Sequence, residues 1–425
     1  MKRLLSLAVV LLSISLSAQN TYLHCGKLID TKNGTILSNK TVIVSGNKII
    51  SVNDGYTNSN NSDDLVIDLK DKTVMPGFID MHVHIEGETS PTRYIDAFTK
   101  NEADTAFKSV EIAERTLLAG FTTVRDLGGS GVNVALRNAI AKGTVSGPRI
   151  FTVEKAIGTT GGHADPTNGR NKKLMGDPGP AEGVINSPSD ARKAVRQRYK
   201  NGADLIKITA TGGVLSVSKN GQNPQFTQEE VNEIVKTAKE YGMVVAAHAH
   251  GKEGMQRAIK AGVQTIEHGS FMDKETADLM IQYNTYLVPT LSAGRFVGEQ
   301  AKIPNYYPAI ILPKIASTMA VLEETFEMVS KSGVLIAFGT DAGVFPHGEN
   351  AKEFGFMVET GWSPMFSIQS ATITNAKLLD MENQLGQISA GFIADIVATD
   401  EDPTQNIHTT ENVSFVMKEG KIYKQ

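Results

Sequence analysis

After Gly77 the sequence settles into an alternation of short apolar runs and longer amphipathic stretches, and this pattern limits the fold more than any other feature. The apolar runs are typical of buried strands: FIDMHVH, FTTVRD, RIFTVE, DLIKITA, VVAAHAH, TIEH, TYLVPT and VLIAFGTDA. The stretches between them include helix candidates at 104–118, 189–201, 227–240, 252–261 and 315–331. Eight strands alternating with helices over about 270 residues predict an α/β fold of the (β/α)8 TIM-barrel type. A doubly wound open sheet remains an alternative, because alternation alone does not separate the two.

Both ends of the chain follow a different pattern, in which short strands are separated by turns. The N-terminal part contains YLHCGKLID, TVIVSGNKIISV and LVIDL, and the C-terminal part contains GQISAGFIADIVATDED and VSFVMKEGKIYK. Chain termini often lie close together, so we expect the two ends to pair. The predicted organisation is a small β-sandwich domain from residues 19–75 and 385–425 and a barrel from 76–384. A helix in SPMFSIQSATITNAKLLDM would link the barrel back to the sandwich.

The first residues predict where the protein is found. Lys2 and Arg3 precede an apolar run from Leu4 to Leu16, which closes on small residues at Ser17 and Ala18. This run is too short to span a membrane and has the flanks of a cleaved secretory signal, so residues 1–18 are expected to be removed. No later apolar run is long enough for a membrane span. We therefore expect a periplasmic or secreted protein.

The amino-acid composition limits how the fold can be stabilised and which classes of partner the protein can bind. The single cysteine, Cys25, excludes an intrachain disulfide, so the fold must be held by its core. A net charge of −4 with 21% charged residues, and no basic patch, argues against nucleic acid as a partner. A small-molecule substrate is the better expectation.

Polar residues with metal-binding or acid–base chemistry gather at the C-terminal ends of the predicted strands, where barrel enzymes build their active sites. Five of the nine histidines fall there. The set comprises His82, His84, Lys207, His248, His250, His268 and Asp341. Each has a simpler reading on its own: a lone histidine is often a hydrogen-bonded core residue, and an aspartate can cap the next helix.

Lys207 is the least expected member of the set. It lies between Ile206 and Ile208 in an interior strand, where lysine is almost never buried without a partner. Burial favours the neutral amine, which could react with carbon dioxide to form an anionic carbamate able to bridge two cations. The alternative is a salt bridge to a neighbouring carboxylate. Arg125, on the second strand, is expected to pair with Asp126 or with a carboxylate of the long 158–183 loop.

Nitrogen and oxygen ligands of this kind suit zinc or another divalent transition metal. Two metals a few ångströms apart can activate a bridging water and polarise a carbonyl.

Six motifs together resemble the amidohydrolase superfamily, in particular its imidazolonepropionase-like and prolidase-like branch. They are PGFIDMHVH, GFTTVRDLGG, ADLIKITATGGVLS, VVAAHAHGKEGMQRAIKAGVQTIEHG, IAFGTDAG and GQISAGFIADIV, in the family's order and covering nearly the whole chain after residue 18. The resemblance implies a binuclear metal-dependent hydrolase that cleaves amide bonds of dipeptides or N-acyl amino acids, in a prolidase- or carboxypeptidase-like manner. It also implies two divalent ions, with zinc expected, and leaves homo-oligomerisation open.

The resemblance also implies residue roles. His82 and His84 resemble ligands of the more buried metal, Lys207 the carboxylated bridging lysine, and His248 and His268 the ligands of the second metal. Asp341 resembles the aspartate that binds metal and shuttles the proton. His250 resembles a residue that contacts substrate or stabilises the oxyanion, and His163 in the 158–183 loop matches a position near the substrate, although it could equally organise the loop.

Other functions remain open at this point. Within enzymes, the alternatives are a cyclic-amide hydrolase of the imidazolonepropionase type and an aryl-amide hydrolase acting on mycotoxins. Outside enzymes, a periplasmic binding protein could use the same barrel. Specificity is expected to lie in the 158–183 and 291–312 loops.

Overall fold

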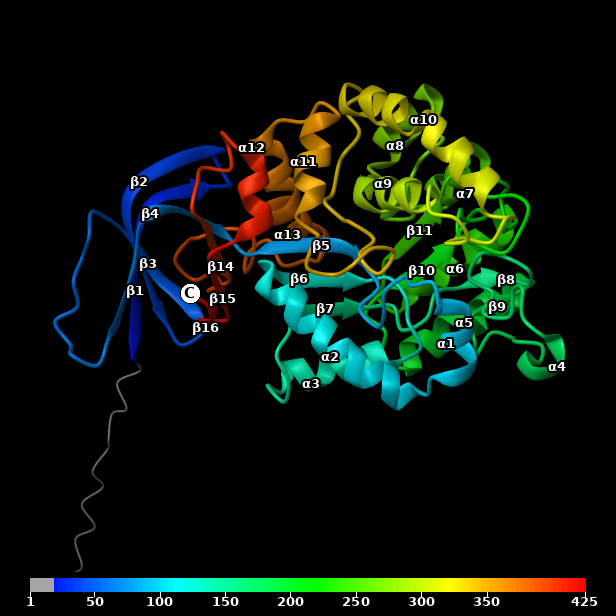
Figure 1. Ribbon diagram of the computed structural model, residues 1–425, viewed down its shortest axis with the longest axis horizontal. Helices are drawn as coiled ribbons and strands as arrows, with labels where there is room; N and C mark the ends of the chain where they lie inside the picture. Colours follow the sequence, from blue (N-terminus) through cyan, green and yellow to red (C-terminus); the bar gives the residue numbers. More distant parts are fainter. Residues whose placement is uncertain (1–18) are drawn as a thin grey trace, which may run out of the picture.

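The computed structural model describes residues 19–425, so the predicted secretory signal lies outside the described residues. The described chain forms a barrel and an adjoining β-sandwich built from both chain ends (Figure 1). Between residues 19 and 425 no helix is long and apolar enough to cross a membrane.

Seven regular strands form most of the barrel wall, in two parallel groups. The first group is β5 (Phe78–Val83), β6 (Phe121–Asp126) and β7 (Arg149–Thr152), and the second is β10 (Ile206–Thr209), β11 (Val245–Ala249), β12 (Thr265–His268) and β13 (Tyr286–Val288). Every residue of β5, β6, β10, β11 and β12 is buried, which explains why these runs do not alternate apolar and polar residues.

Isolated parallel bridges close the barrel. Ile157 pairs with Ile208 and joins the two groups of strands. The eighth strand position is occupied by the segment 335–342, whose backbone pairs with β13 through Leu287 and with β5 through Val83. Asp341 N donates to His82 O at 2.7 Å within this seam. The (β/α)8 barrel is therefore confirmed, and the open-sheet alternative is wrong.

Helices surround the barrel (Figure 1). All five helix candidates are present, as α2 (Glu102–Leu118), α5 (Pro188–Lys200), α6 (Gln228–Glu240), α7 (Lys252–Ala261) and α10 (Leu312–Ser330). The structure adds α1 (Arg93–Thr99), α3 (Val132–Ala141), α4 (Lys172–Met175), α8 (Lys274–Tyr283), α9 (Leu291–Gln300) and α11 (Lys352–Glu359). The expectation of a loop over 291–312 is wrong for its first half, because α9 forms there. The buried Glu353 side chain accepts from the backbone N–H groups of Leu291 and Ser292 at 2.8 and 2.7 Å and so caps that helix.

The sandwich is a seven-stranded sheet in the order β16-β15-β14-β4-β1-β2-β3. Its strands are β1 (Asn20–Asp30), β2 (Thr35–Ser45), β3 (Lys48–Asp54), β4 (Leu65–Pro76), β14 (Ile396–Thr399), β15 (Phe415–Lys418) and β16 (Lys421–Lys424). The two chain ends meet where β4 pairs antiparallel with β14, as the blue and red strands of Figure 1 show. Inward side chains such as Leu23, Cys25 and Phe415 form its own fully buried cluster. The exact domain boundaries at residues 75 and 385 remain predictions.

The predicted linking helix is present in three pieces: α12 (Pro364–Gln369), a π-helical turn (Ser370–Thr374) and α13 (Asn375–Leu378). Asn375 Nδ2 donates to Ile79 O at 2.7 Å and to Phe338 O at 2.9 Å. One side chain thus ties this helix to the first strand and to the eighth strand position of the barrel.

Candidate metal centre and active site

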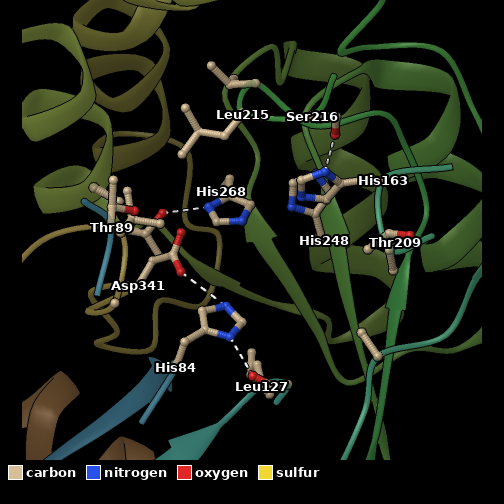
Figure 2. A pocket seen from close by; sticks show the side chains of 18 of the residues that line it. His84, Thr89, Leu127, His163, Thr209, Leu215, Ser216, His248, His268 and Asp341 are labelled. Atoms are coloured by element: carbon tan, nitrogen blue, oxygen red, sulfur yellow. Dashed lines mark hydrogen bonds and ion pairs between the residues drawn. The ribbon is translucent and has the colours of Figure 1, made fainter. Parts of the chain in front are cut away.

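A cavity of about 840 Å³ opens at the C-terminal ends of the barrel strands. All eight side chains singled out in the sequence line it: His82, His84, His163, Lys207, His248, His250, His268 and Asp341. In Figure 2, Asp341 lies beside His84 and His268, while His163 and His248 lie on the other side of His268. The barrel therefore brings together every predicted site residue.

One group of ligand atoms surrounds Asp341. The ligand atoms of His82, His268 and Asp341 lie within 4.8 Å of one another. Asp341 Oδ1 lies 3.4 Å from His82 Nε2 and 3.3 Å from His84 Nε2, and the Lys207 amine lies 3.5 Å from His82 Nε2. No helix follows Asp341 until Lys352, so the helix-cap explanation for this aspartate is wrong. These atoms converge as the ligands of a shared cation would.

A second group consists of imidazoles. The ligand atoms of His248, His250 and His268 also lie within 4.8 Å of one another, so His268 belongs to both groups. The His268 ring centroid lies 4.7 Å from that of His248 and 4.9 Å from that of His250. The geometry therefore places His250 as close to a metal position as His248, whereas the family resemblance gives it a role toward substrate.

Hydrogen bonds behind the rings decide which nitrogen faces the cavity. The Nδ1 atoms of three rings are occupied: His84 by Gly128 O at 2.8 Å, His250 by Ser270 Oγ at 2.9 Å and His268 by Thr290 Oγ1 at 2.7 Å. His248 is the reverse, because its Nε2 lies 3.1 Å from Gly212 O and its Nδ1 remains for a ligand. Such outer partners fix ring orientation and tautomer in metal sites.

A buried ion pair lies behind the His82 ring and holds it in place. Glu267 Oε2 lies 2.9 Å from His82 Nδ1, and Glu267 Oε1 accepts from Arg125 Nη2 at 2.8 Å. Burial alone would raise the pKa of Glu267, but Arg125 and His82 outweigh it and hold the pKa at about 2. Glu267 is therefore a permanent carboxylate behind the site.

This ion pair corrects the expectation for Arg125, whose partner is Glu267 rather than Asp126 or a carboxylate of the 158–183 loop. Asp126 instead accepts from Asn133 Nδ2 and Thr152 Oγ1. Sequence reasoning also missed Glu267 itself. The signal was present, because a glutamate inside the buried four-residue strand TIEH is as unexpected as Lys207 in its own strand.

The Lys207 side chain is buried, and no carboxylate of the described chain lies within ion-pair distance of its amine. The salt-bridge explanation is therefore wrong for residues 19–425. Burial lowers the pKa of Lys207 to about 8, which the nearby charges of Glu267 and Asp341 only partly oppose. The amine therefore loses its proton more readily than that of an ordinary lysine, and its neutral fraction grows as the pH approaches 8.

Four of the imidazoles, those of His82, His248, His250 and His268, are held in the neutral form that binds metal. Burial lowers the pKa of His82 and of His250 to about 4, and it lowers the pKa of His248 and His268 well below the usual value. His84 differs, because Asp341 outweighs its burial and raises its pKa. Neutral imidazoles, one carboxylate and one deprotonatable lysine fit divalent transition metals.

The backbone is strained at the strand ends. His268, Thr290 and Asp341 adopt φ values of 74°, 53° and 60°, in the left-handed region that ordinary residues rarely occupy. The turn at His268 also breaks strand alternation, so Glu267 and His268 both reach His82 from neighbouring positions. Strain of this kind is concentrated at functional sites.

His163 enters the cavity from the 158–183 loop, which is anchored by pairing of β8 (Gly158–Thr159) with β9 (Val184–Ile185). Its ring stacks on that of His248 with centroids 4.3 Å apart, and its Nδ1 meets Ser216 Oγ. Burial lowers its pKa to about 3. The ring therefore stands neutral beside the second group of imidazoles.

Comparison with known proteins gives a consistent picture. The sequence pattern described as "Amidohydrolase family" matches residues 73–423. An ochratoxinase from Aspergillus niger is 31% identical, over 83% of this chain and 75% of that protein. The crystal structure of a Xaa-Pro dipeptidase with bound methionine in the active site has 51% identity and a TM-score of 0.93, covering 96% of this chain and 100% of the other. A prolidase complexed with N-methylphosphonate-L-proline has 33% identity and a TM-score of 0.87, covering 96% and 100%.

Proposed function

This chain belongs to the amidohydrolase family and is a hydrolase of amide bonds, and we propose that it is a two-zinc dipeptidase or N-acyl amino acid hydrolase of the prolidase type. The observation that carries the proposal is that two groups of ligand atoms converge on one cavity and share His268. Lys207, whose pKa is lowered by burial, lies beside them.

The two groups divide the metal ligands between two positions. His82 and His84 would hold one ion, His248 and His268 the other, with Asp341 at the first. Lys207 would join them as a carbamate: its neutral nitrogen attacks carbon dioxide, a C–N bond forms, and one proton leaves to solvent. The carbamate anion would add two oxygen ligands to the metal-binding set. When bound, the ions supply Lewis-acid activation of water and of the amide carbonyl.

Asp341 carries the proton in this scheme. Burial would raise its pKa, but His82, His84 and Lys207 outweigh it and lower the pKa, so Asp341 is a carboxylate at neutral pH. It accepts a proton from the attacking water and returns it to the nitrogen of the leaving amine. His250 and His163, both neutral and facing the cavity, are placed to donate hydrogen bonds toward substrate oxygen.

The apolar lining of the cavity favours a substrate with an apolar side chain. Helices α9 and α10 each turn one face to the cavity, and each face has the i, i+4 or i, i+3 spacing of a helical stripe. These residues are Ala293, Gly294, Val297, Ile315, Met319 and Leu322. The stripe on α9 begins one turn after Thr290, which holds His268, so the apolar wall starts beside the reacting centre.

Two cationic side chains in the cavity wall favour a substrate with a free carboxylate. Lys155 and Arg170 line the cavity, and neither makes an ion pair within the part of the chain that the structure describes. An acyl amino acid or dipeptide presents both features, an apolar group and a carboxylate. The relatives crystallised with methionine and with a proline derivative support the same substrate class.

Hydrolysis of bulky aryl amides is the second candidate. Its support is the ochratoxinase relative together with a cavity of about 840 Å³, which is larger than a small dipeptide needs. A periplasmic or secreted location completes the proposal and rests on residues 1–18.

A dipeptide and N-acyl amino acid library, assayed with zinc-loaded protein, tests the function. We expect release of free amino acid from Xaa-Pro dipeptides or N-acyl amino acids, most rapidly where the acyl part is apolar, and about a thousandfold slower release by Asp341→Asn. Turnover of aryl amides without turnover of any dipeptide would select the second candidate and overturn the first.

A further inference from the structure

Lys314, in the first turn of α10, is a buried cation that folding alone does not explain. It is only 7% exposed, and no carboxylate among residues 19–425 lies within ion-pair distance of its amine. A positive charge in the first turn of a helix is also disfavoured by the helix dipole. A buried lysine without a counter-ion is costly, so its retention requires a compensating interaction.

The Lys314 amine donates its hydrogen bonds to a single loop. Its Nζ donates to Gly213 O at 3.0 Å and to Ser216 O at 2.6 Å. These two carbonyls belong to the segment 212–217, hereafter the clamp loop, which follows β10 and leads away from Lys207. Lys314 therefore ties the clamp loop to helix α10 at two points.

The clamp loop in turn holds two imidazoles of the site. Gly212 O, next to one Lys314 acceptor, lies 3.1 Å from His248 Nε2, and Ser216 Oγ, on the other acceptor residue, meets His163 Nδ1. The loop backbone also lies close against His163: a side chain added at Gly213 would place its Cβ 2.2 Å from that ring. Small shifts of the clamp loop would therefore release both rings.

We propose that Lys314 is a positioning residue: by holding the clamp loop, it presents His248 Nδ1 to the second metal ion and His163 to substrate. The inference rests on the proposed two-metal hydrolysis and deepens it. Electrostatics act in the same direction, since after burial the charge of Lys314 is among the causes that lower the pKa of His163 and of His250. Burial is the main cause that keeps these rings neutral, and the Lys314 charge adds to it.

Three variants test the role. Lys314→Met keeps the length of the side chain and removes its donors, Lys314→Arg keeps a charged donor, and Lys219→Met removes an exposed lysine just beyond the clamp loop as a matched control. Metal affinity of apo protein, measured by chelator competition, is read beside kcat and KM. Nitrogen NMR of the histidine rings in apo protein reports the tautomer of His248 without requiring activity.

We expect Lys314→Met to weaken binding of the second metal ion about tenfold and to lower kcat by a similar factor. Loss of the hydrogen bonds that orient metal ligands has effects of this size. Its His248 ring should show mixed tautomers, Lys314→Arg should recover most of the loss, and Lys219→Met should match wild type. Wild-type affinity, kcat and tautomer in a folded Lys314→Met protein would overturn the inference. An inactive, metal-free wild type would instead overturn the proposed function, so the two failures are distinguishable.

Discussion

Glu267 lies with one carboxylate oxygen 2.9 Å from His82 Nδ1 and with the other 2.8 Å from the guanidinium of Arg125. All three side chains are buried, and they come from three different strands, β12, β5 and β6. This chain of contacts holds the His82 ring so that its Nε2 points to Asp341 and Lys207. A buried ion pair inside the barrel thus supports the geometry of the metal centre.

Glu267→Gln should damage both stability and metal binding. The change leaves Arg125 buried without its charge partner, which costs about 3 kcal/mol of unfolding free energy. It also removes the hydrogen-bond partner that orients His82, which should weaken metal binding about tenfold. Denaturant unfolding and chelator competition measure the two effects. Glu299→Gln, which removes an exposed glutamate paired with Lys302, is the control and should change stability by less than about 1 kcal/mol. A stable, fully metallated Glu267→Gln protein would refute the support role.

Formation of the Lys207 carbamate should depend on pH. The pKa of Lys207 is lowered to about 8, so the reactive neutral amine increases as pH rises toward 8 and levels off above it. At constant dissolved carbon dioxide, reactivation of apo protein with zinc should accelerate about tenfold from pH 6 to 7. Labelled carbon dioxide should give a carbamate carbon signal in wild type and none in Lys207→Met. A rate that does not change with pH, or an unlabelled active enzyme, would rule out the carbamate.

Asp341→Asn should separate metal binding from turnover. The amide keeps an oxygen near His82 and His84 but cannot accept the proton of the attacking water, so kcat should fall about a thousandfold. Metal content should remain close to that of wild type, by elemental analysis. An Asp341→Asn enzyme that retains its rate would show that another group moves the proton.

Filling the apolar wall should change specificity by substrate size. A Cβ at Gly294 would approach Leu322 Cδ2 at 3.1 Å, and both residues line the cavity, so the larger side chain of Gly294→Leu changes the shape of the apolar wall. We expect kcat/KM to fall about tenfold or more for substrates with a bulky apolar group, and little for glycine-containing ones. Gly294→Ala is the graded control. Equal losses for all substrates would mean that α9 does not contact the apolar group.

The barrel could be predicted because the strand and helix runs of such a fold lie in sequence order. The eight strand positions and the ring of polar strand ends follow from local pattern, and Lys207 was recognisable because lysine is rare in a buried strand. Helix α9 was missed because its start depends on Glu353, a residue far along the chain that caps Leu291 and Ser292.

The outer support of the site could not be predicted for the same reason. Glu267 and His268 are neighbours, so strand alternation would place them on opposite faces, and only the left-handed backbone at His268 lets both reach His82. The pairing of Arg125 with Glu267 spans 142 positions of sequence and competes locally with Asp126. Which carboxylate wins depends on the three-dimensional closure of the barrel.

Metal content is the most direct test of the central claim that two ligand groups hold two ions. Elemental analysis of protein purified without chelator and dialysed against metal-free buffer should give close to two zinc-type ions per chain, with activity proportional to the second ion. Replacing His248, which belongs only to the second group, should leave close to one. One ion or none in active wild-type protein would contradict the binuclear account.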